Sequence, residues 1–341
     1  MTRAEVLGWL REDDPARLDE LWRRADEARR RVVGDEVHLR GLVEVSNHCV
    51  RTCAYCGIRA GAPVTRYRMS PLEIFECALQ ATALGYGTVV LQAGEDFGLE
   101  PEVVAETIRA IRKHTPLAIT LSLGERTDDE LAAWREAGAD RYLLRFETSN
   151  RALYDRIHPS RGREHSDRIA MLRRLRALGY AAGGGVMVGL PGQTLDDLAD
   201  DIAMFARLDL DMIGIGPYLP HPATPLAAEP RPAWDSELMT YRMVALARLA
   251  CPGANIPGTT ALATVNRAEG RELALSRGAN VLMPNLTPTR YREHYEIYPD
   301  KACLRETADV CDGCLRKRLH AIGRTVGEGR GDARREARSE P

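Results

Sequence analysis

The chain has 341 residues, of which 44% are hydrophobic and 28% charged, and its net charge is -2. This composition excludes a disordered or fibrous chain, and the balanced charge gives no general attraction to nucleic acid or an anionic membrane. No apolar run approaches the roughly 18 residues of a membrane helix. We therefore expect a cytoplasmic protein without nucleic-acid or membrane partners. Because the cytoplasm is reducing, its eight cysteines should not form structural disulfides.

Residues 1–40 are rich in Arg, Glu and Ala with apolar residues at helical spacing, which predicts an N-terminal helical segment. From about residue 41, short apolar runs alternate with longer amphipathic stretches. This alternation predicts eight strands, each followed by a helix. The predicted strands span residues 42–45, 88–92, 117–123, 141–146, 185–189, 212–215, 255–259 and 280–283.

Local signals mark the ends of the intervening helices. Ser70, Thr127 and Thr194 each stand three residues before Glu or Asp, which predicts capping boxes. Glycines that suit a positive φ close four amphipathic stretches, namely Gly85, Gly138, Gly179 and Gly278.

The strands are continuously apolar, which favours a parallel sheet covered by helices. The simplest α/β fold is a (β/α)8 TIM-type barrel over residues 41–290, and a doubly wound sheet is the alternative. Residues 291–325 form a C-terminal extension that contains a second cysteine group, and the Arg- and Gly-rich residues 326–341 are predicted to be a mobile tail.

The loop after the first predicted strand contains Cys49, Cys53 and Cys56, with C-x3-C-x2-C spacing. Three thiolates on one loop can each bind one iron of a [4Fe–4S] cluster and leave the fourth iron open to another ligand. A structural zinc site is the alternative, but it usually needs four ligands, and His48 is badly placed to share a metal with its neighbour Cys49.

This loop resembles that of the radical S-adenosylmethionine (SAM) enzymes, with Tyr55 at the position of their aromatic residue. The resemblance implies a barrel of the radical SAM kind in which SAM binds the open iron. It also implies that SAM is cleaved to a 5′-deoxyadenosyl radical. By the same resemblance, a further set of residues meets SAM: Gln92, Gly94, Ser122, Glu147, Arg168 and Met187.

Longer strings resemble the HydE-type maturases of [FeFe]-hydrogenase. They are RYRMSPLEI from Arg66, VVLQAGED from Val89, TLSLGE from Thr120, GADRYLLRFETSN from Gly138, MVGLPGQT from Met187, GIGPYLPHPATPLA from Gly214, NIPGTTA from Asn255 and GANVLMPN from Gly278. Phe146 departs from the family string, where His is expected, and we expect it to lie beside the cavity. The resemblance also implies that Cys303, Cys311 and Cys314 hold an accessory cluster, either [2Fe–2S] or [4Fe–4S].

The same family implies a substrate cavity inside the barrel, lined by Arg145, Thr120, Thr259, Thr260, Met283, Tyr295 and Tyr298. One guanidinium with several hydroxyls suits a small anionic ligand. The resemblance implies a small organometallic or cysteine-containing substrate, an iron complex with carbonyl, cyanide and cysteine ligands. It also implies reduced ferredoxin or flavodoxin as electron donor, and other hydrogenase maturases as partners.

Three alternatives remain at this point. The chain is also similar to methylornithine synthase and biotin synthase, although the latter should carry further cluster ligands on its strands. A non-catalytic iron–sulfur scaffold would hold clusters that do not respond to SAM.

Cys77 and Cys251 fall on predicted helices and are interpreted as buried packing residues.

Overall fold

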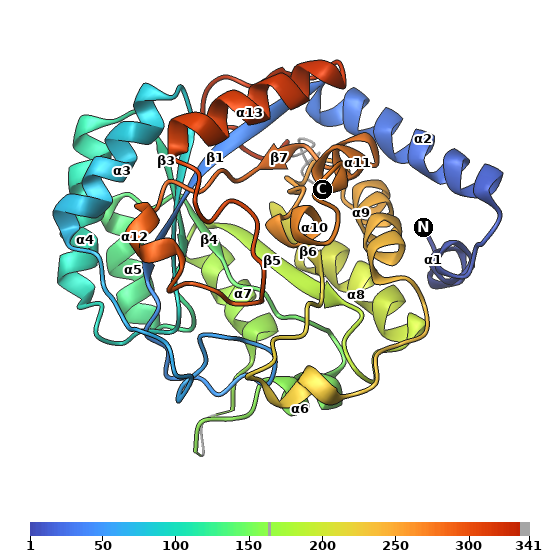
Figure 1. Ribbon diagram of the computed structural model, residues 1–341, viewed down its shortest axis with the longest axis horizontal. Coiled ribbons are helices and arrows are strands. Elements are labelled where there is room, and N and C mark those ends of the chain that lie inside the picture. Colours follow the sequence, from blue (N-terminus) through green and yellow to red (C-terminus); the bar gives the residue numbers. More distant parts are fainter. Residues whose placement is uncertain (163–164, 335–341) are drawn as a thin grey trace.

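The computed structural model describes residues 1–162 and 165–334. A curved parallel sheet surrounded by helices forms most of the molecule (Figure 1). Its strands lie in the order β6-β5-β4-β3-β2-β1-β7. They are β1 (Glu36–Ser46), β2 (Thr88–Ala93), β3 (Ala118–Ser122), β4 (Arg141–Leu143), β5 (Ala181–Val188), β6 (Met212–Pro217) and β7 (Val281–Leu282).

The two edges of this sheet meet through a short connecting segment. Asn255 forms a parallel bridge with Met212 of β6, and Pro257 forms one with Val281 of β7. The sheet therefore closes as a (β/α) barrel, as the sequence predicts. The predicted seventh strand over residues 255–259 is reduced to these two bridges, because Pro257 cannot donate to a ladder.

Helices cover the outside of the barrel. They are α3 (Pro71–Ala83), α4 (Pro101–His114), α5 (Asp128–Ala137), α6 (Arg151–Ile157), α7 (Arg168–Ala177), α8 (Leu195–Leu208), η1 (Pro225–Ala228), α9 (Ser236–Ala250), α10 (Thr260–Val265), α11 (Gly270–Ser276), α12 (Thr289–Arg292) and α13 (Ala308–Ala321). The capping boxes predicted at Ser70, Thr127 and Thr194 are all present. The four predicted helix-ending glycines all have positive φ.

Two N-terminal helices, α1 (Arg3–Leu10) and α2 (Pro15–Val33), pack on α8 and α9 at one side of the barrel (Figure 1).

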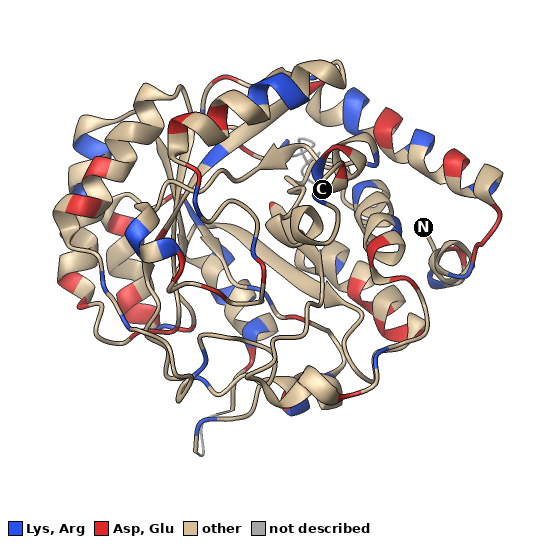
Figure 2. Cartoon of the chain, in the orientation of Figure 1, with Lys and Arg blue, Asp and Glu red and all other residues tan. Residues whose placement is uncertain are grey.

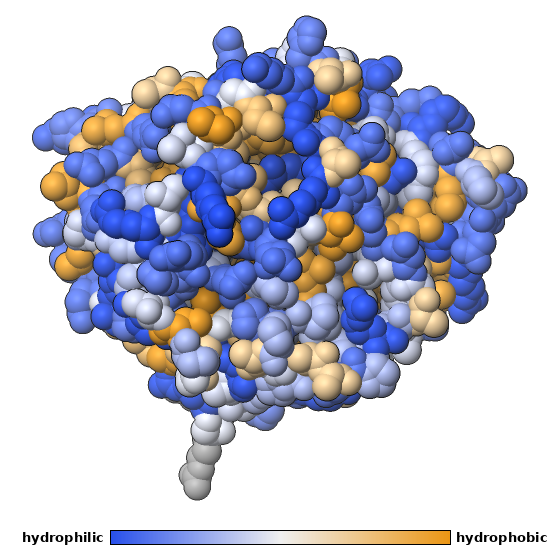
Figure 3. All heavy atoms as spheres, viewed as in Figure 1, coloured by the Kyte–Doolittle hydropathy of each residue, from blue (hydrophilic) through white to orange (hydrophobic). Residues whose placement is uncertain are grey.

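Charges of both signs are mixed on the outer helices (Figure 2). On the face shown in Figure 3, hydrophobic residues are scattered among hydrophilic ones. Among the described residues, no helix is both long and apolar enough to cross a membrane.

The end of the chain closes the N-terminal end of the barrel. Strand β8 (Thr325–Val326) pairs with the start of β1, and the next amide, Gly327, donates to Val37 O over 3.0 Å. Further on, Arg334 N donates to Gly253 O over 2.9 Å. Residues 326–334, expected to belong to a mobile tail, thus form a strap across the barrel floor, whereas residues 335–341 lie outside the described part.

Side chains inside the barrel hold this strap. The buried Arg141 donates to Arg330 O over 2.7 Å and pairs with the Asp332 carboxylate at 2.6 Å. The buried Arg40 donates to Gly331 O over 3.0 Å. The strap therefore provides carbonyl and carboxylate acceptors to two guanidiniums that burial would otherwise destabilise.

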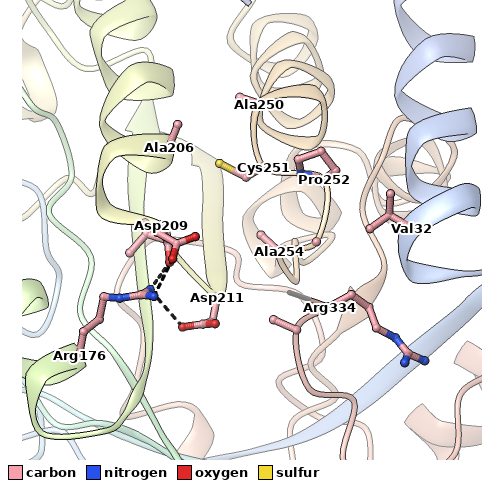
Figure 4. Close-up of a pocket in the computed structure, with 13 residues that line it drawn as sticks. Val32, Arg176, Ala206, Asp209, Asp211, Ala250, Cys251, Pro252, Ala254 and Arg334 are labelled. Atoms are coloured by element: carbon pink, nitrogen blue, oxygen red, sulfur yellow. Dashed lines mark hydrogen bonds and ion pairs between the residues drawn. The ribbon is translucent and has the colours of Figure 1, made fainter. Parts of the chain in front are cut away.

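A cavity of about 520 Å³ lies beside the floor (Figure 4). Arg176 pairs there with Asp209 at 2.7 Å and with Asp211 at 3.5 Å. Cys251 also lines it, and burial raises the pKa of its thiol to about 12. A thiol with so high a pKa is unreactive at neutral pH, which agrees with a packing role.

Candidate functional site

The opposite end of the barrel contains a mouth cavity of about 260 Å³, at the carboxyl ends of the strands. Parallel barrels build their active sites at this end. The cavity is lined by all three residues of the first cysteine group and by every residue predicted to meet SAM, namely Cys49, Cys53, Cys56, Tyr55, Gln92, Gly94, Ser122, Glu147, Arg168 and Met187. The structure thus brings together residues that are up to 138 positions apart in the chain.

The cysteine loop follows β1 and has no regular secondary structure, so neighbouring loops fix its path. Ala54 N donates to Ile157 O over 2.8 Å, at the end of α6. Gly57 N donates to Ile297 O over 2.9 Å, in the segment that follows α12. These contacts hold the three thiols on one side of the cavity before any cofactor binds.

Gly94 is required for this packing. Its amide donates to Ser46 O over 3.0 Å, at the end of β1. A Cβ atom at position 94 would lie 2.2 Å from His48 O and 2.9 Å from Cys49 Cβ. The sequence predicts that this glycine permits close approach of SAM, and the structure shows that it first permits close approach of the cysteine loop.

Burial raises the pKa of all three thiols, and that of Cys53 reaches about 12. The cysteines are therefore neutral at pH 7 until a metal ion binds and displaces their protons. No three His, Cys, Asp or Glu side chains surround a single ion-sized site anywhere in residues 1–162 and 165–334. A cubane cluster attaches each cysteine to a different iron, so three thiols spaced around one cavity fit it better than they fit a single zinc ion.

A buried ionic network surrounds the loop. Arg51 Nε lies 2.5 Å from Glu95 Oε1, and Arg51 Nη2 lies 2.9 Å from Glu125 Oε2. Arg168 Nε donates to Glu125 Oε1 over 2.9 Å and lies 3.8 Å from the Glu95 carboxylate. Burial and the nearby Glu125 raise the pKa of Glu95. Two arginines and two glutamates thus fix the cysteine loop against β2 and β3.

Each nitrogen of the Arg168 guanidinium already contacts a protein group. It donates to Arg145 O over 2.9 Å, and its Nη2 lies 2.8 Å from Nε2 of His158. Burial and the Arg168 charge lower the pKa of His158 to about 2, so this imidazole is neutral and accepts through Nε2. Arg168 thus orients its neighbours, and its contact with SAM stays a prediction.

Glu147 has a strained backbone directly at the mouth. Its φ is 62°, a value that few non-glycine residues adopt. Its backbone N donates to Gly185 O over 2.9 Å, and its O accepts from Met187 N over 3.0 Å. Arg145 Nη2 lies 3.1 Å from the Glu147 carboxylate. Such strain is common where a side chain must point into a functional site.

A smaller inner cavity of about 100 Å³ lies deeper in the barrel. It is lined by four of the predicted substrate-cavity residues, which are Arg145, Thr120, Thr259 and Met283. Arg145, Gln92 and Leu143 line both cavities, so the two spaces lie next to each other. The Thr120 hydroxyl and the Arg145 Nε are buried without a hydrogen-bond partner, as expected for groups that await a ligand.

The remaining predictions for the substrate cavity have mixed outcomes. Tyr295 and Tyr298 line the mouth cavity, whereas Thr260 lines neither space because it is the first residue of α10. Phe146 was expected beside the cavity, but it lies three residues after β4, is buried and lines neither space. Its ring lies 5.8 Å from that of Phe205 on α8.

The second cysteine group lies at the edge of the molecule. Cys303 has a φ of 66° and its sulfur accepts from Arg271 over 3.9 Å. A hydrogen bond with Cys311 lowers the pKa of Cys303. Cys311 is buried on the inner side of α13, whereas Cys314, one turn later, is exposed. Two of the three thiols therefore meet each other, and the third faces solvent.

Comparison with known proteins identifies the architecture. Residues 43–205 match the model of the radical SAM superfamily. The chain is 46% identical over 335 residues to the [FeFe] hydrogenase maturase subunit HydE of Thermotoga maritima, which covers 98% of this chain and 94% of that protein. The chain belongs to the HydE-type family of radical SAM enzymes.

More distant relatives share the fold. A 3-methylornithine synthase of Methanosarcina acetivorans is 27% identical over 78% of this chain and 74% of its own length. The crystal structure of methylornithine synthase superposes with a TM-score of 0.84 at 24% identity, covering 96% of this chain and 94% of the other. That of the maturase HydG has a TM-score of 0.79 at 19% identity, covering 96% of this chain and 75% of the other.

Membership in this radical SAM family implies SAM and a [4Fe–4S] cluster as cofactors. The three cysteines at the mouth are a donor set that fits such a cluster. Sequence reasoning missed four residues of the ionic network, which are Arg51, Glu95, Glu125 and His158. Glu95 lay within a motif that was recognised, but only the fold shows that Arg51 and Glu125 converge on it.

Proposed function

We propose that this radical SAM enzyme acts in assembly of the di-iron cofactor of [FeFe]-hydrogenase. One observation carries the proposal: the mouth cavity, with its three cysteines, lies next to an inner cavity, and Arg145 and Gln92 line both. The proposed SAM site would thus lie beside a small internal space, with the Arg145 guanidinium between them. The 46% identity to a hydrogenase maturase over nearly the whole chain supports the same assignment.

In this proposal Cys49, Cys53 and Cys56 hold the [4Fe–4S] cluster and leave one iron for SAM. Bound together, the cluster and SAM supply a 5′-deoxyadenosyl radical. Tyr55 and Met187 pack together in an apolar cluster at the mouth, and they exclude water from the site. Ser122 and Glu147 provide a hydroxyl and a carboxylate for the polar parts of SAM.

The inner cavity holds the substrate. A small iron complex with carbonyl, cyanide and cysteine ligands would carry negative charge, which the Arg145 guanidinium can stabilise by hydrogen bonds. Thr120 and Thr259 add hydroxyls, and Met283 adds an apolar wall. Because the inner space borders the mouth cavity at Arg145 and Gln92, the substrate would meet the radical on this side.

The second cysteine group extends this proposal. Cys303, Cys311 and Cys314 would hold an accessory iron–sulfur cluster, with the exposed Cys314 closing it from the solvent side. A small redox protein, reduced ferredoxin or flavodoxin, would supply the electron for SAM cleavage. Other hydrogenase maturases would supply the substrate and receive the product, and the reaction would take place in the cytoplasm.

The test is electron paramagnetic resonance of the anaerobically reconstituted, reduced protein with and without SAM. We expect a [4Fe–4S] signal that shifts when SAM is added and is lost in Cys53→Ala. A signal that does not respond to SAM would contradict the enzyme and favour a scaffold. Activation of an immature [FeFe]-hydrogenase by this protein and its partner maturases then tests the substrate assignment.

A further inference from the structure

Lysine is rare in this chain, and one lysine is buried. Only three of the 47 Lys and Arg residues are lysine, namely Lys113, Lys301 and Lys317. Lys113 and Lys317 are exposed, whereas Lys301 is 6% exposed. A buried lysine must be paired, because removing its charge from water is costly. Its partners therefore show what it does.

Lys301 pairs with Glu44, which is 0% exposed on the upper part of β1. The same ammonium donates to Tyr295 O over 3.3 Å and lies 5.1 Å from the centre of the Tyr295 ring. The Lys301 ammonium thus connects β1 with Tyr295, and Lys301 and Tyr295 are the two ends of the segment formed by residues 295–301. We call this segment the roof segment.

Glu44 is itself rigidly held. Its second carboxylate oxygen accepts from Asn285 Nδ2 over 3.0 Å, and its backbone N donates to Thr287 Oγ1 over 2.8 Å. Its backbone O accepts from the Tyr67 hydroxyl over 2.8 Å. The carboxylate that receives Lys301 is therefore a fixed point of the barrel.

The roof segment forms one wall of the mouth cavity. Tyr295, Ile297 and Tyr298 all line this cavity, and Gln92 Nε2 donates to the Tyr295 hydroxyl over 3.4 Å. The segment has no helix or strand, so its own backbone provides little to keep it in place. The ion pair of Lys301 replaces the missing regular structure.

The same anchor reaches the second cysteine group. Arg292, which is 1% exposed, donates to Asn285 O over 2.8 Å and to Cys303 O over 3.1 Å. Cys303 lies two residues after Lys301. The loop that carries this cysteine is thus tied to the residues that hold Glu44.

We infer that Lys301 is a positioning residue: its ion pair with Glu44 latches the roof segment and so sets Tyr295 and Tyr298 against the mouth cavity, where SAM would bind. This inference rests on the proposed function, because it takes the mouth cavity, which the roof segment lines, to be the SAM site. A hydrophobic pair would fill the same space and stabilise the fold equally well. What the ion pair adds is one directional contact that places the segment in a single position.

The latch is tested first without any catalytic assay. Amine acetylation of the reconstituted protein, read by mass spectrometry, compares all three lysines in one sample. We expect Lys301 to react at least about tenfold more slowly than Lys317, because acetylation requires the roof segment to open. In Glu44→Gln we expect the Lys301 rate to rise toward that of Lys317. Equal rates in the unmodified protein, or no rise in the variant, would overturn the latch.

Positioning is tested by hydrogenase activation in four variants. We expect Lys301→Met to lower activation about tenfold, since small misplacements of site residues have large effects on rate. Glu44→Gln with Lys301→Met removes the unpaired buried charge, so it should recover the Tm but not the activation. Lys301→Arg should recover most of the activation, and the exposed control Lys317→Met should match the unmodified protein.

Recovery of both Tm and activation in the double variant would overturn the positioning role and leave a purely structural pair. Normal activation by Lys301→Met would also overturn it. Failure of the proposed function has a different signature, namely a cluster in the unmodified protein that does not respond to SAM. In that case the acetylation rates still decide whether the latch exists.

Discussion

The two cysteine groups contain three thiols each but have different surroundings. The first lies on a loop that is fixed by neighbouring backbone and by a buried network of two arginines and two glutamates. The second has one buried, one half-buried and one exposed thiol, and its loop is held chiefly through Arg292. Two groups with the same number of thiols therefore differ in how far their surroundings are preorganised, and we expect the better-ordered first group to be the reactive one.

The largest expected effect comes from the first group itself. Cys53→Ala should abolish SAM cleavage, because one iron would lose its only protein ligand. The measurement is 5′-deoxyadenosine formation with dithionite as reductant, together with the iron content. Cys77→Ala is the matched control, because this buried thiol on α3 donates only to Leu286 O, at 3.6 Å. Retained cleavage in Cys53→Ala would show that the cluster lies elsewhere.

The next effect tests the ionic network. Glu95→Gln keeps the shape of the side chain but removes the charge that faces Arg51 and Arg168. We expect SAM cleavage to fall about tenfold to a hundredfold, as is typical when groups that orient metal ligands are changed. Glu102→Gln, on the exposed face of α4, is the control. If both variants behave alike, the network has no part in preorganising the loop.

An intermediate effect concerns stability at acidic pH. The pKa of His158 is about 2 in the folded protein, far below the 6.5 of a free histidine side chain, so the unfolded chain binds the extra proton. Stability from this residue is therefore lost as pH falls below about 6.5, by roughly 2 kcal/mol between pH 6.5 and 5. His158→Gln should make the free energy of unfolding less dependent on pH over this range.

This change in slope is measured by urea denaturation at several pH values. The exposed His320→Gln is the matched control, and its profile should follow that of the unmodified protein. An unchanged slope in His158→Gln would mean that this imidazole is protonated in the folded state.

The smallest effect is expected in the second group. Cys314→Ser replaces an exposed thiol without loss of packing, so the free energy of unfolding should change by less than about 0.5 kcal/mol. SAM cleavage should change less than about twofold, because the first group keeps its surroundings. A large loss of cleavage would remove the distinction between the two cysteine groups.

Much of the fold follows from local signals in the sequence. The capping boxes at Ser70, Thr127 and Thr194 and the glycines at helix ends are short-range features, and they predicted the helix boundaries. Pairing across the barrel is not local. For this reason the segment at residues 255–259 was predicted as a strand, although it forms only two bridges.

The candidate site also has parts that local sequence predicts and parts that depend on contacts between distant residues. The cysteine spacing and the residues predicted to meet SAM could be named because family strings identify them one position at a time. The engagement of Arg168 with Glu125 and His158 could not be predicted, since these residues come from separate loops that only the barrel brings together. Thr260 and Phe146 were misplaced because side-chain direction depends on backbone that the strings do not specify.

The sequence by itself determined the repeating strand and helix pattern, the two cysteine groups and the family. Only the tertiary structure decided that residues 326–334 close the barrel floor and that Lys301 latches the roof segment to Glu44. The physical reason is the same for the barrel floor and for the roof segment. A polar, glycine-rich tail and a single lysine carry no hydrophobic period, so their order depends on buried partners, Arg141 and Glu44, that lie far away in the chain.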